Sequence, residues 1–96
     1  MEVKLKSNKN GGVFSLYENE KRLGYMTFSF NDTDVINVNS TFIDPDYRNL
    51  GYAKILFDSM ISYAIKNNYK IVPICSYVTK LFERKKELQY LLNKNN

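Results

Sequence analysis

The sequence predicts a single α+β domain: a four-stranded antiparallel meander, then a long helix, a central parallel strand and a C-terminal helix. Two patterns support this prediction. Up to Ile43, short segments of alternating apolar and polar residues are separated by turn clusters, as in neighbouring antiparallel strands. From about Asn49, apolar residues recur every three or four positions, as on one face of a helix. The 96 residues suffice for one domain, which we assign to residues 1–96.

Four segments of the first half are predicted strands: residues 3–6, 13–17, 23–30 and 35–43. The first is short and carries lysines, which suits the edge of a sheet. In the fourth, strict alternation places Ile36, Val38 and Phe42 on a common face. The turns between the segments are short, which favours a meander.

The second half predicts two helices around one strand. Pro45 ends the fourth strand, because proline lacks a backbone donor and restricts the residue before it. The first helix covers about residues 49–67, and residues 70–74 form a compact apolar run that suits a buried parallel strand. The second helix covers residues 79–92 with a break near Arg84-Lys85-Lys86, and residues 93–96 are expected to fray. The apolar face of the first helix consists of Ala53, Leu56, Phe57, Met60, Ile61 and Ala64.

Composition excludes several kinds of chemistry. One cysteine and no histidine leave no intrachain disulfide, no ordinary structural zinc site and no histidine base, so we expect no metal. No apolar run approaches the ~20 residues that span a bilayer, and the N-terminus lacks the apolar stretch of a signal peptide. We therefore expect a soluble, cytoplasmic protein without a membrane partner.

The net charge of +4 fits a solvated surface, a polyanionic ligand or nucleic acid. Lysines and arginines are spread along the chain, and no basic stripe with regularly interleaved aromatic residues is present. This distribution disfavours nucleic acid.

The junction between the fourth strand and the first helix carries the pattern R-x-x-G-x-A in Arg48, Gly51 and Ala53. A helix start offers unpaired N–H groups and the positive end of the helix dipole, both of which favour a phosphate. Glycine leaves room for an anion to approach the backbone, and Arg48 can add a charge-assisted contact. The junction is therefore a candidate phosphate site.

These residues resemble the pyrophosphate loop of the GNAT superfamily of acyl-CoA N-acyltransferases, which has the pattern Q/R-x-x-G-x-G/A between a strand and a helix. The resemblance implies a GNAT-like fold that binds acetyl-CoA or coenzyme A. It implies that the segment from Arg48 through Asn49, Leu50, Gly51 and Tyr52 to Ala53 grips the pyrophosphate. It also implies that the pantetheine arm pairs with backbone around Phe42 and Ile43.

A second segment, Pro73-Ile74-Cys75-Ser76-Tyr77-Val78, is similar to the P-x-C-x-Y-V signature of the very small GNAT-like proteins. Two positions depart from that pattern. Ser40 stands where these relatives often have histidine, and Lys85-Lys86 stands where they tend to have histidine-proline. A role that depends on those histidines is in doubt here.

Cys75 and Tyr77 are the candidate catalytic residues. Cys75 either accepts the acyl group, lines the acyl pocket or is a small packing residue. Tyr77 is placed to protonate the leaving thiolate, or is an ordinary aromatic residue where a strand meets a helix. The sequence names no general base.

Three functions remain open. The first is acetyl transfer from acetyl-CoA to an unidentified amine, directly or through the cysteine thiol. The second is a CoA- or acyl-CoA-binding module without efficient catalysis, and the third is a small nucleic-acid binder. We rank them in that order, and the sequence determines neither the acceptor nor the oligomeric state.

Overall fold

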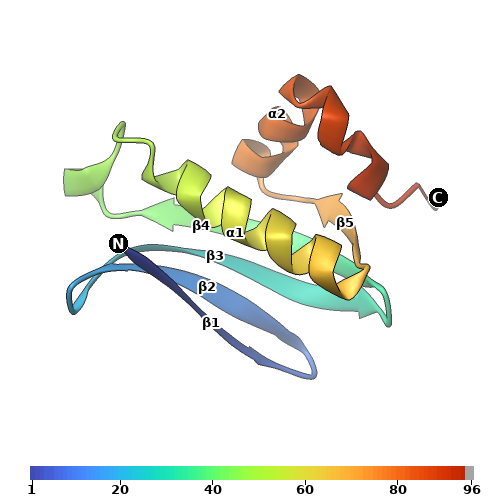
Figure 1. The fold of residues 1–96 in the computed structure, drawn as a ribbon, viewed down its shortest axis with the longest axis horizontal. Coiled ribbons are helices and arrows are strands. Elements are labelled where there is room, and N and C mark those ends of the chain that lie inside the picture. Colours follow the sequence, from blue (N-terminus) through green and yellow to red (C-terminus); the bar gives the residue numbers. More distant parts are fainter. Residues whose placement is uncertain (95–96) are drawn as a thin grey trace.

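The computed structural model describes residues 1–94, which form one five-stranded sheet with its helices packed on a single face (Figure 1). The strands follow one another in the order β1-β2-β3-β4-β5. Each neighbouring pair among the first four is antiparallel, and β5 runs parallel to β4. The predicted α+β meander, its long helix and the parallel pair are therefore confirmed. The elements are β1 (Glu2–Asn8), β2 (Gly11–Glu18), β3 (Lys21–Asp32), β4 (Val35–Ile43), the 3-10 turn η1 (Pro45–Tyr47), α1 (Tyr52–Asn67), β5 (Lys70–Pro73), α2 (Ser76–Arg84) and the 3-10 helix η2 (Lys86–Leu91).

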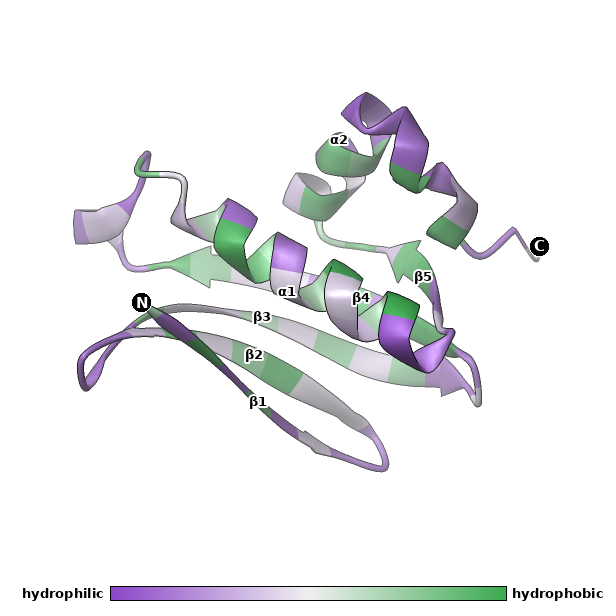
Figure 2. Cartoon of the chain, viewed as in Figure 1, coloured by the Kyte–Doolittle hydropathy of each residue, from purple (hydrophilic) through white to green (hydrophobic). Residues whose placement is uncertain are grey.

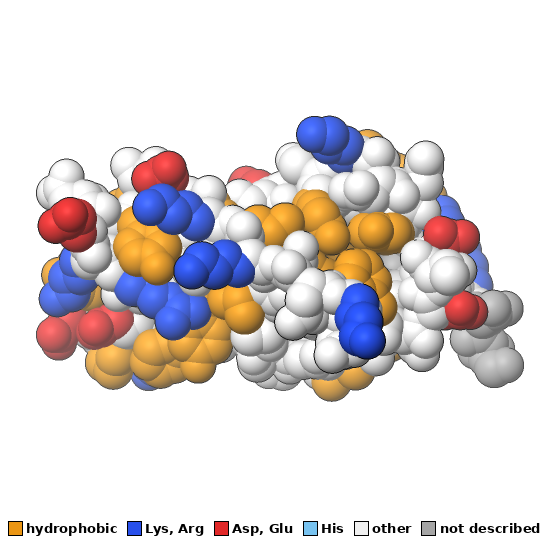
Figure 3. All heavy atoms as spheres, turned by 90° about the horizontal axis from the view of Figure 1, so that it is seen from below, with side chains coloured by type: hydrophobic (Ala, Val, Ile, Leu, Met, Phe, Trp, Pro, Cys, Tyr) orange, Lys and Arg blue, Asp and Glu red, His pale blue; other side chains and the backbone are white. Residues whose placement is uncertain are grey.

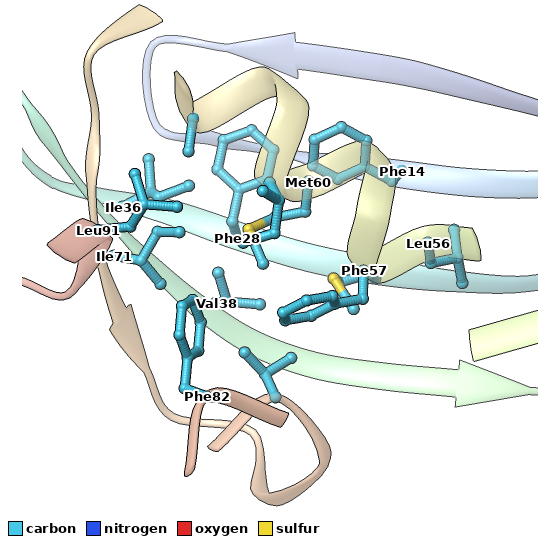
Figure 4. Close-up of a cluster of buried hydrophobic side chains, with 14 of the residues drawn as sticks. Phe14, Phe28, Ile36, Val38, Leu56, Phe57, Met60, Ile71, Phe82 and Leu91 are labelled. Atoms are coloured by element: carbon cyan, nitrogen blue, oxygen red, sulfur yellow. The ribbon is translucent and has the colours of Figure 1, made fainter. Parts of the chain in front are cut away.

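The core lies between the sheet and the two α-helices. The apolar stripe of α1 is buried as predicted, except that Ala53 at its start is only partly buried. Strands β2, β3 and β4 point apolar side chains toward the helices. Hydrophobic and more polar residues therefore follow one another along these strands (Figure 2). Phe57 of α1 meets Phe82 of α2 edge to face, with ring centroids 5.6 Å apart, and Val38 lies beside them (Figure 4). The two helices thus close one continuous core.

A β-bulge at Asn39 corrects the predicted face of β4. Thr27 pairs with Ser40 and Phe28 pairs with Val38, so Asn39 is the extra residue on β4. The extra residue reverses the alternation beyond it. Ile36 and Val38 are fully buried, but Phe42 is 41% exposed on the opposite face. The prediction that Phe42 shares their face was wrong, because strict alternation takes no account of a bulge.

Strand β5 lies at the edge of the sheet and not at its centre. Beyond β4, its other side meets only an isolated bridge between Ile71 and Leu92 within the described residues. Asn93 is held there too, since its N–H donates to the carbonyl of Ile71 at 2.9 Å. The fraying expected for residues 93–96 stays a prediction for 93 and 94, and for residues 95 and 96 it lies outside the described part of the chain.

The second helix begins three residues earlier than predicted, at Ser76, and the predicted break occurs at Lys85 between α2 and η2. Cys75 precedes α2 in an extended conformation and serves as its N-cap residue. Across residues 1–94, none of the helices has the length and apolar character needed to cross a membrane.

We predict that Phe57→Ala lowers the free energy of unfolding by about 3–5 kcal/mol, because it leaves a cavity in the middle of the core. Ile65→Ala is the matched control on the same helix, where the side chain is 47% exposed and should cost much less. Urea unfolding followed by circular dichroism measures both. Equal losses in the two variants would contradict the assignment of Phe57 to the core.

Candidate functional site

The site begins where β4 and β5 separate. Their parallel pairing ends at Val38 and Pro73. The N–H groups of Ile74 and Cys75 then both donate to the carbonyl of Val38, each at 3.0 Å, and the chain turns into α2. The last residues of β4 keep β3 as a neighbour but have no strand on their other side. One side of this part of β4 is therefore an open strand edge, which we call the open edge of β4.

The backbone groups at the open edge belong to Thr41 and Ile43. The N–H of Asp44 donates to the carbonyl of Leu23 on β3 at 2.8 Å. Because successive residues of a strand face opposite neighbours, Phe42 also faces β3, and Thr41 and Ile43 face away from it. The carbonyl of Ile43 confirms this direction, since it accepts a hydrogen bond from Nε of Arg48 at 2.8 Å.

A short loop connects β4 to α1 and sets the start of the helix. Asp44 accepts a hydrogen bond from the N–H of Asp46 at 2.9 Å, and η1 follows. Asn49 and Gly51 then adopt positive φ angles of 65° and 82°. These left-handed residues cannot extend a right-handed helix, so α1 begins at Tyr52, three residues later than predicted.

The N-terminus of α1 is open to an anion. Gly51 is the N-cap residue, no side chain caps the helix, and its first turn contains no acidic residue. A Cβ added at Gly51 would meet nothing within 4 Å. The N–H groups of this turn and the positive end of the helix dipole therefore face free space, which favours a phosphate.

A hollow of about 400 Å³ joins the helix start, the open edge of β4 and α2. Its lining contains all but two of the residues that the sequence singled out. Leu50, which is 57% exposed, and Cys75, which contacts the lining residue Thr41, are not part of the lining. The lining residues are Thr41, Phe42, Ile43, Tyr47, Arg48, Asn49, Gly51, Tyr52, Ala53, Lys54 and Tyr77.

Sequence reasoning did not single out Thr41, Tyr47 and Lys54. Tyr47 and Lys54 flank the R-x-x-G-x-A segment, so their proximity in sequence was a usable signal. Thr41 had no such signal, because its direction depends on the bulge at Asn39. Ser40 points to the other face of the sheet, where its hydroxyl lies 2.6 Å from that of Thr27.

The charge around the hollow is positive. The guanidinium of Arg48 lies over the ring of Phe42, 5.7 Å from its centroid. Nζ of Lys54 contacts Oδ2 of Asp58 at 2.9 Å, and this is the only ion pair among residues 1–94. Arg48 thus has no carboxylate partner among the described residues and keeps its charge for a ligand.

Tyr77 lines the hollow from α2 as a neutral phenol. Burial raises its pKa above the ordinary value of 10.0, the charge of Asp58 raises it further, and Lys54 opposes the shift. At neutral pH the hydroxyl therefore carries its proton and can donate it, but it cannot act as a base.

Cys75 contacts the hollow through one intermediary. Its Sγ donates a weak hydrogen bond to Oγ1 of Thr41 at 3.4 Å, and its carbonyl accepts one from Oγ1 of Thr79 at 3.0 Å. The side chain is partly exposed. Thr41, which lines the hollow, therefore stands between the thiol and the hollow.

The fold is that of the acetyltransferases related to GCN5. A GCN5-like protein from Staphylococcus aureus superposes with a TM-score of 0.63 at 24% identity, over 97% of this chain and 90% of that one. The ribosomal-protein-S18-alanine N-acetyltransferase of Escherichia coli gives 0.69 at 18% identity, over 81% of this chain and 53% of that one. Tetrahymena GCN5 gives 0.66 at 13% identity, over 93% and 63%. This chain therefore spans about half to two thirds of the two larger proteins.

Residues 13–91 match the family model described as GCN5-related N-acetyl-transferase. The chain therefore belongs to the GCN5-related N-acetyltransferase family. No match is found among curated protein sequences. The narrower resemblance, to small proteins with the P-x-C-x-Y-V signature, stays a prediction.

We predict that the phenol of Tyr77 titrates above pH 10.0, because burial disfavours its charged form. The difference between the ultraviolet titrations of wild type and Tyr77→Phe isolates this group. In Asp58→Asn the midpoint should fall but stay raised, since burial is the larger cause. A midpoint at or below 10.0 in wild type would contradict the assigned environment.

Proposed function

We propose that this protein is an N-acetyltransferase that binds acetyl-CoA in the hollow and transfers the acetyl group to an amine. The observation that supports this best is the union, in one hollow, of an uncapped helix start, an open strand edge and a protonated phenol. Family membership supports the same reaction class.

The pyrophosphate of acetyl-CoA fits the start of α1. We assign its binding to the segment from Arg48 to Ala53, with backbone N–H groups and the charge of Arg48 as the attractive contacts. In this proposal Asn49 and Leu50 shape the backbone of the pyrophosphate segment. The side chain of Leu50 is exposed and is not assigned a contact. Lys54 adds a second cation at the rim, where it is shared with Asp58.

The pantetheine arm fits the open edge of β4. Its amide groups need hydrogen-bond partners once they leave water, and an unpaired strand edge supplies both donors and acceptors. The backbone groups of Thr41 and the N–H of Ile43 face this edge, and Arg48 already holds the carbonyl of Ile43. We therefore assign the arm to Thr41 and Ile43, with Phe42 contributing its side chain to the lining.

Acetyl transfer requires a proton for the departing thiolate. In the proposed step, the amine nitrogen attacks the thioester carbonyl, a C–N bond forms, and the C–S bond breaks. The phenol of Tyr77 gives its proton to the sulfur, the amine releases its own proton to solvent, and Tyr77 regains a proton from solvent. A raised pKa keeps Tyr77 protonated before the step, as this role requires.

A covalent route through Cys75 is the second candidate, and its contact with Thr41 is the observation that favours it. In that route the cysteine sulfur attacks the thioester carbonyl, CoA leaves as the thiol, and the acetyl group then passes from sulfur to the amine. A CoA-binding module without efficient catalysis is the alternative function, and it predicts binding without turnover. The single domain over residues 1–96 and the cytoplasmic location remain part of the proposal.

We predict that Gly51→Ala weakens CoA binding at least tenfold, about 1.4 kcal/mol, because its Cβ enters the space through which phosphate approaches. The substitution also strains the backbone, since Gly51 has a positive φ. Asn68→Ala is the matched control: it has a positive φ of 58° at the other end of α1 and leaves the hollow unchanged.

Calorimetry with CoA and thermal unfolding separate these two effects. Both variants should lose a similar amount of stability, about 1 kcal/mol, but Asn68→Ala should keep wild-type affinity. Wild-type affinity in Gly51→Ala would place the phosphate elsewhere. The absence of heat at millimolar CoA in the wild type would overturn the proposed function.

The role of Cys75 is tested by intact mass after incubation with acetyl-CoA. If the thiol accepts the acetyl group, wild type should gain one acetyl mass and Cys75→Ser should not, although serine nearly preserves the volume. Iodoacetamide should then label Cys75 rapidly, and CoA should protect it. Unchanged turnover of a model amine by Cys75→Ser would end the covalent route and leave direct transfer.

A further inference from the structure

The second face of the sheet is uncovered, because both α-helices pack on the other one (Figure 1). Aromatic side chains from three successive strands lie on this open face: Tyr17 of β2, Tyr25 of β3 and Phe42 of β4. Figure 3 views the molecule from this side. In one half of the face, lysine and arginine side chains lie over hydrophobic ones, with acidic side chains at its margin.

Each of these three rings carries a cation. Nζ of Lys4 is 5.1 Å from the ring centroid of Tyr17, and the guanidinium of Arg22 is 4.6 Å from that of Tyr25. Arg48 lies over Phe42 in the same way. None of these cations forms an ion pair with a carboxylate among residues 1–94. The rings hold the positive charges in place without neutralising them.

A hollow of about 280 Å³ lies beside two of these cations, Lys4 and Arg22. Lys4, Lys6 and Arg22 contribute three positive charges to its lining, and the lining includes no acidic side chain. The other lining residues are Val13, Ser15 and Tyr17. Glu2 is the acidic residue next to the lining: it pairs with Tyr17 across β1 and β2 and forms no ion pair with a residue of the described chain. The positive charge of the hollow's lining therefore favours a carboxylate.

The open face leads to the proposed acetyl-CoA site. Phe42 stacks on Tyr25, with centroids 5.3 Å apart, and Phe42 also lines the larger hollow together with Arg48. From β1 to β4 the distance is three strand spacings, about 14 Å. An extended peptide of four or five residues covers roughly that length. A chain lying across the strands could thus reach both hollows.

We propose that the open face binds an acidic peptide segment of the acetyl acceptor, with one carboxylate in the hollow of Lys4, Lys6 and Arg22. This inference rests on the proposed function, because it names the acceptor class for the same site. Nucleic acid suits the face less well. Tyr25 and Phe42 stack on each other and each carries a guanidinium, which leaves little ring surface for a base.

The test uses a synthetic peptide of about eight residues, long enough to cross the face. It has a free N-terminal amine, glutamate at alternating positions and a fluorophore at its C-terminus. Its control replaces every glutamate by glutamine. Fluorescence anisotropy should show binding of the glutamate peptide that weakens as salt rises, and no comparable binding of the glutamine peptide.

Two double variants locate the binding surface. Lys4→Gln/Arg22→Gln should weaken the binding of the glutamate peptide by about fivefold, as expected for the loss of two exposed charge contacts. Lys66→Gln/Arg84→Gln removes the same charges from exposed positions on the helices and should leave binding unchanged. Thermal unfolding confirms that each variant is folded.

The outcomes separate this inference from the proposed function. Calorimetry with CoA should give wild-type affinity in Lys4→Gln/Arg22→Gln, since neither residue lines the CoA hollow. CoA binding without binding of the glutamate peptide overturns the acidic acceptor and leaves the acetyltransferase. Equal effects of the two double variants also overturn the acidic acceptor, because the peptide would then respond to the net charge of the protein and not to the hollow. Tighter binding of an oligouridine of similar length, lost in Lys4→Gln/Arg22→Gln, would assign the face to nucleic acid instead.

Discussion

The carbonyl of Val38 accepts hydrogen bonds from both Ile74 and Cys75, and so ends the pairing of β4 with β5. The bulge at Asn39 follows at once on β4. Together they turn one half of β4 into a paired strand and the other half into an open edge beside the start of α1. A continuous β4–β5 ladder would fill that edge with backbone hydrogen bonds, and no hollow could form there.

The bulge also determines which side chains serve which face. Before it, Ile36 and Val38 point into the core. Beyond it, Thr41 turns toward Cys75 on the helix side, and Phe42 turns toward Tyr25 on the open side. One extra residue therefore separates the side of the site where we propose the acyl group from the aromatic face, where we propose the acceptor. A chain of 96 residues has few secondary-structure elements, so a single strand here contributes residues to both faces.

The positive charge of both hollows comes from groups that have no acidic partner in the described chain. The helix start has no cap and no acid, and Arg48, Lys4 and Arg22 have aromatic rings where a carboxylate would neutralise them. A cation on a ring keeps its position and its charge, so both hollows are positive before any ligand arrives. Lys54 differs, because Asp58 already pairs with it.

Local patterns in the sequence determined most of the fold. The alternating segments, Pro45 and the stripe from Leu56 to Ala64 predict the meander, the turn and α1, because each depends on neighbours in sequence. The R-x-x-G-x-A segment likewise predicts the open helix start, since Arg48, Gly51 and Ala53 are local to it.

Only the tertiary structure decided the direction of Thr41 and Phe42, the edge position of β5 and the aromatic row across three strands. Each depends on register between segments far apart in the chain. A bulge shifts that register by one residue, and the apolar residues Ile36, Val38 and Phe42 by themselves are equally compatible with unbroken alternation. The sequence therefore determined which residues could form the site, and the pairing of the strands decided which way they face.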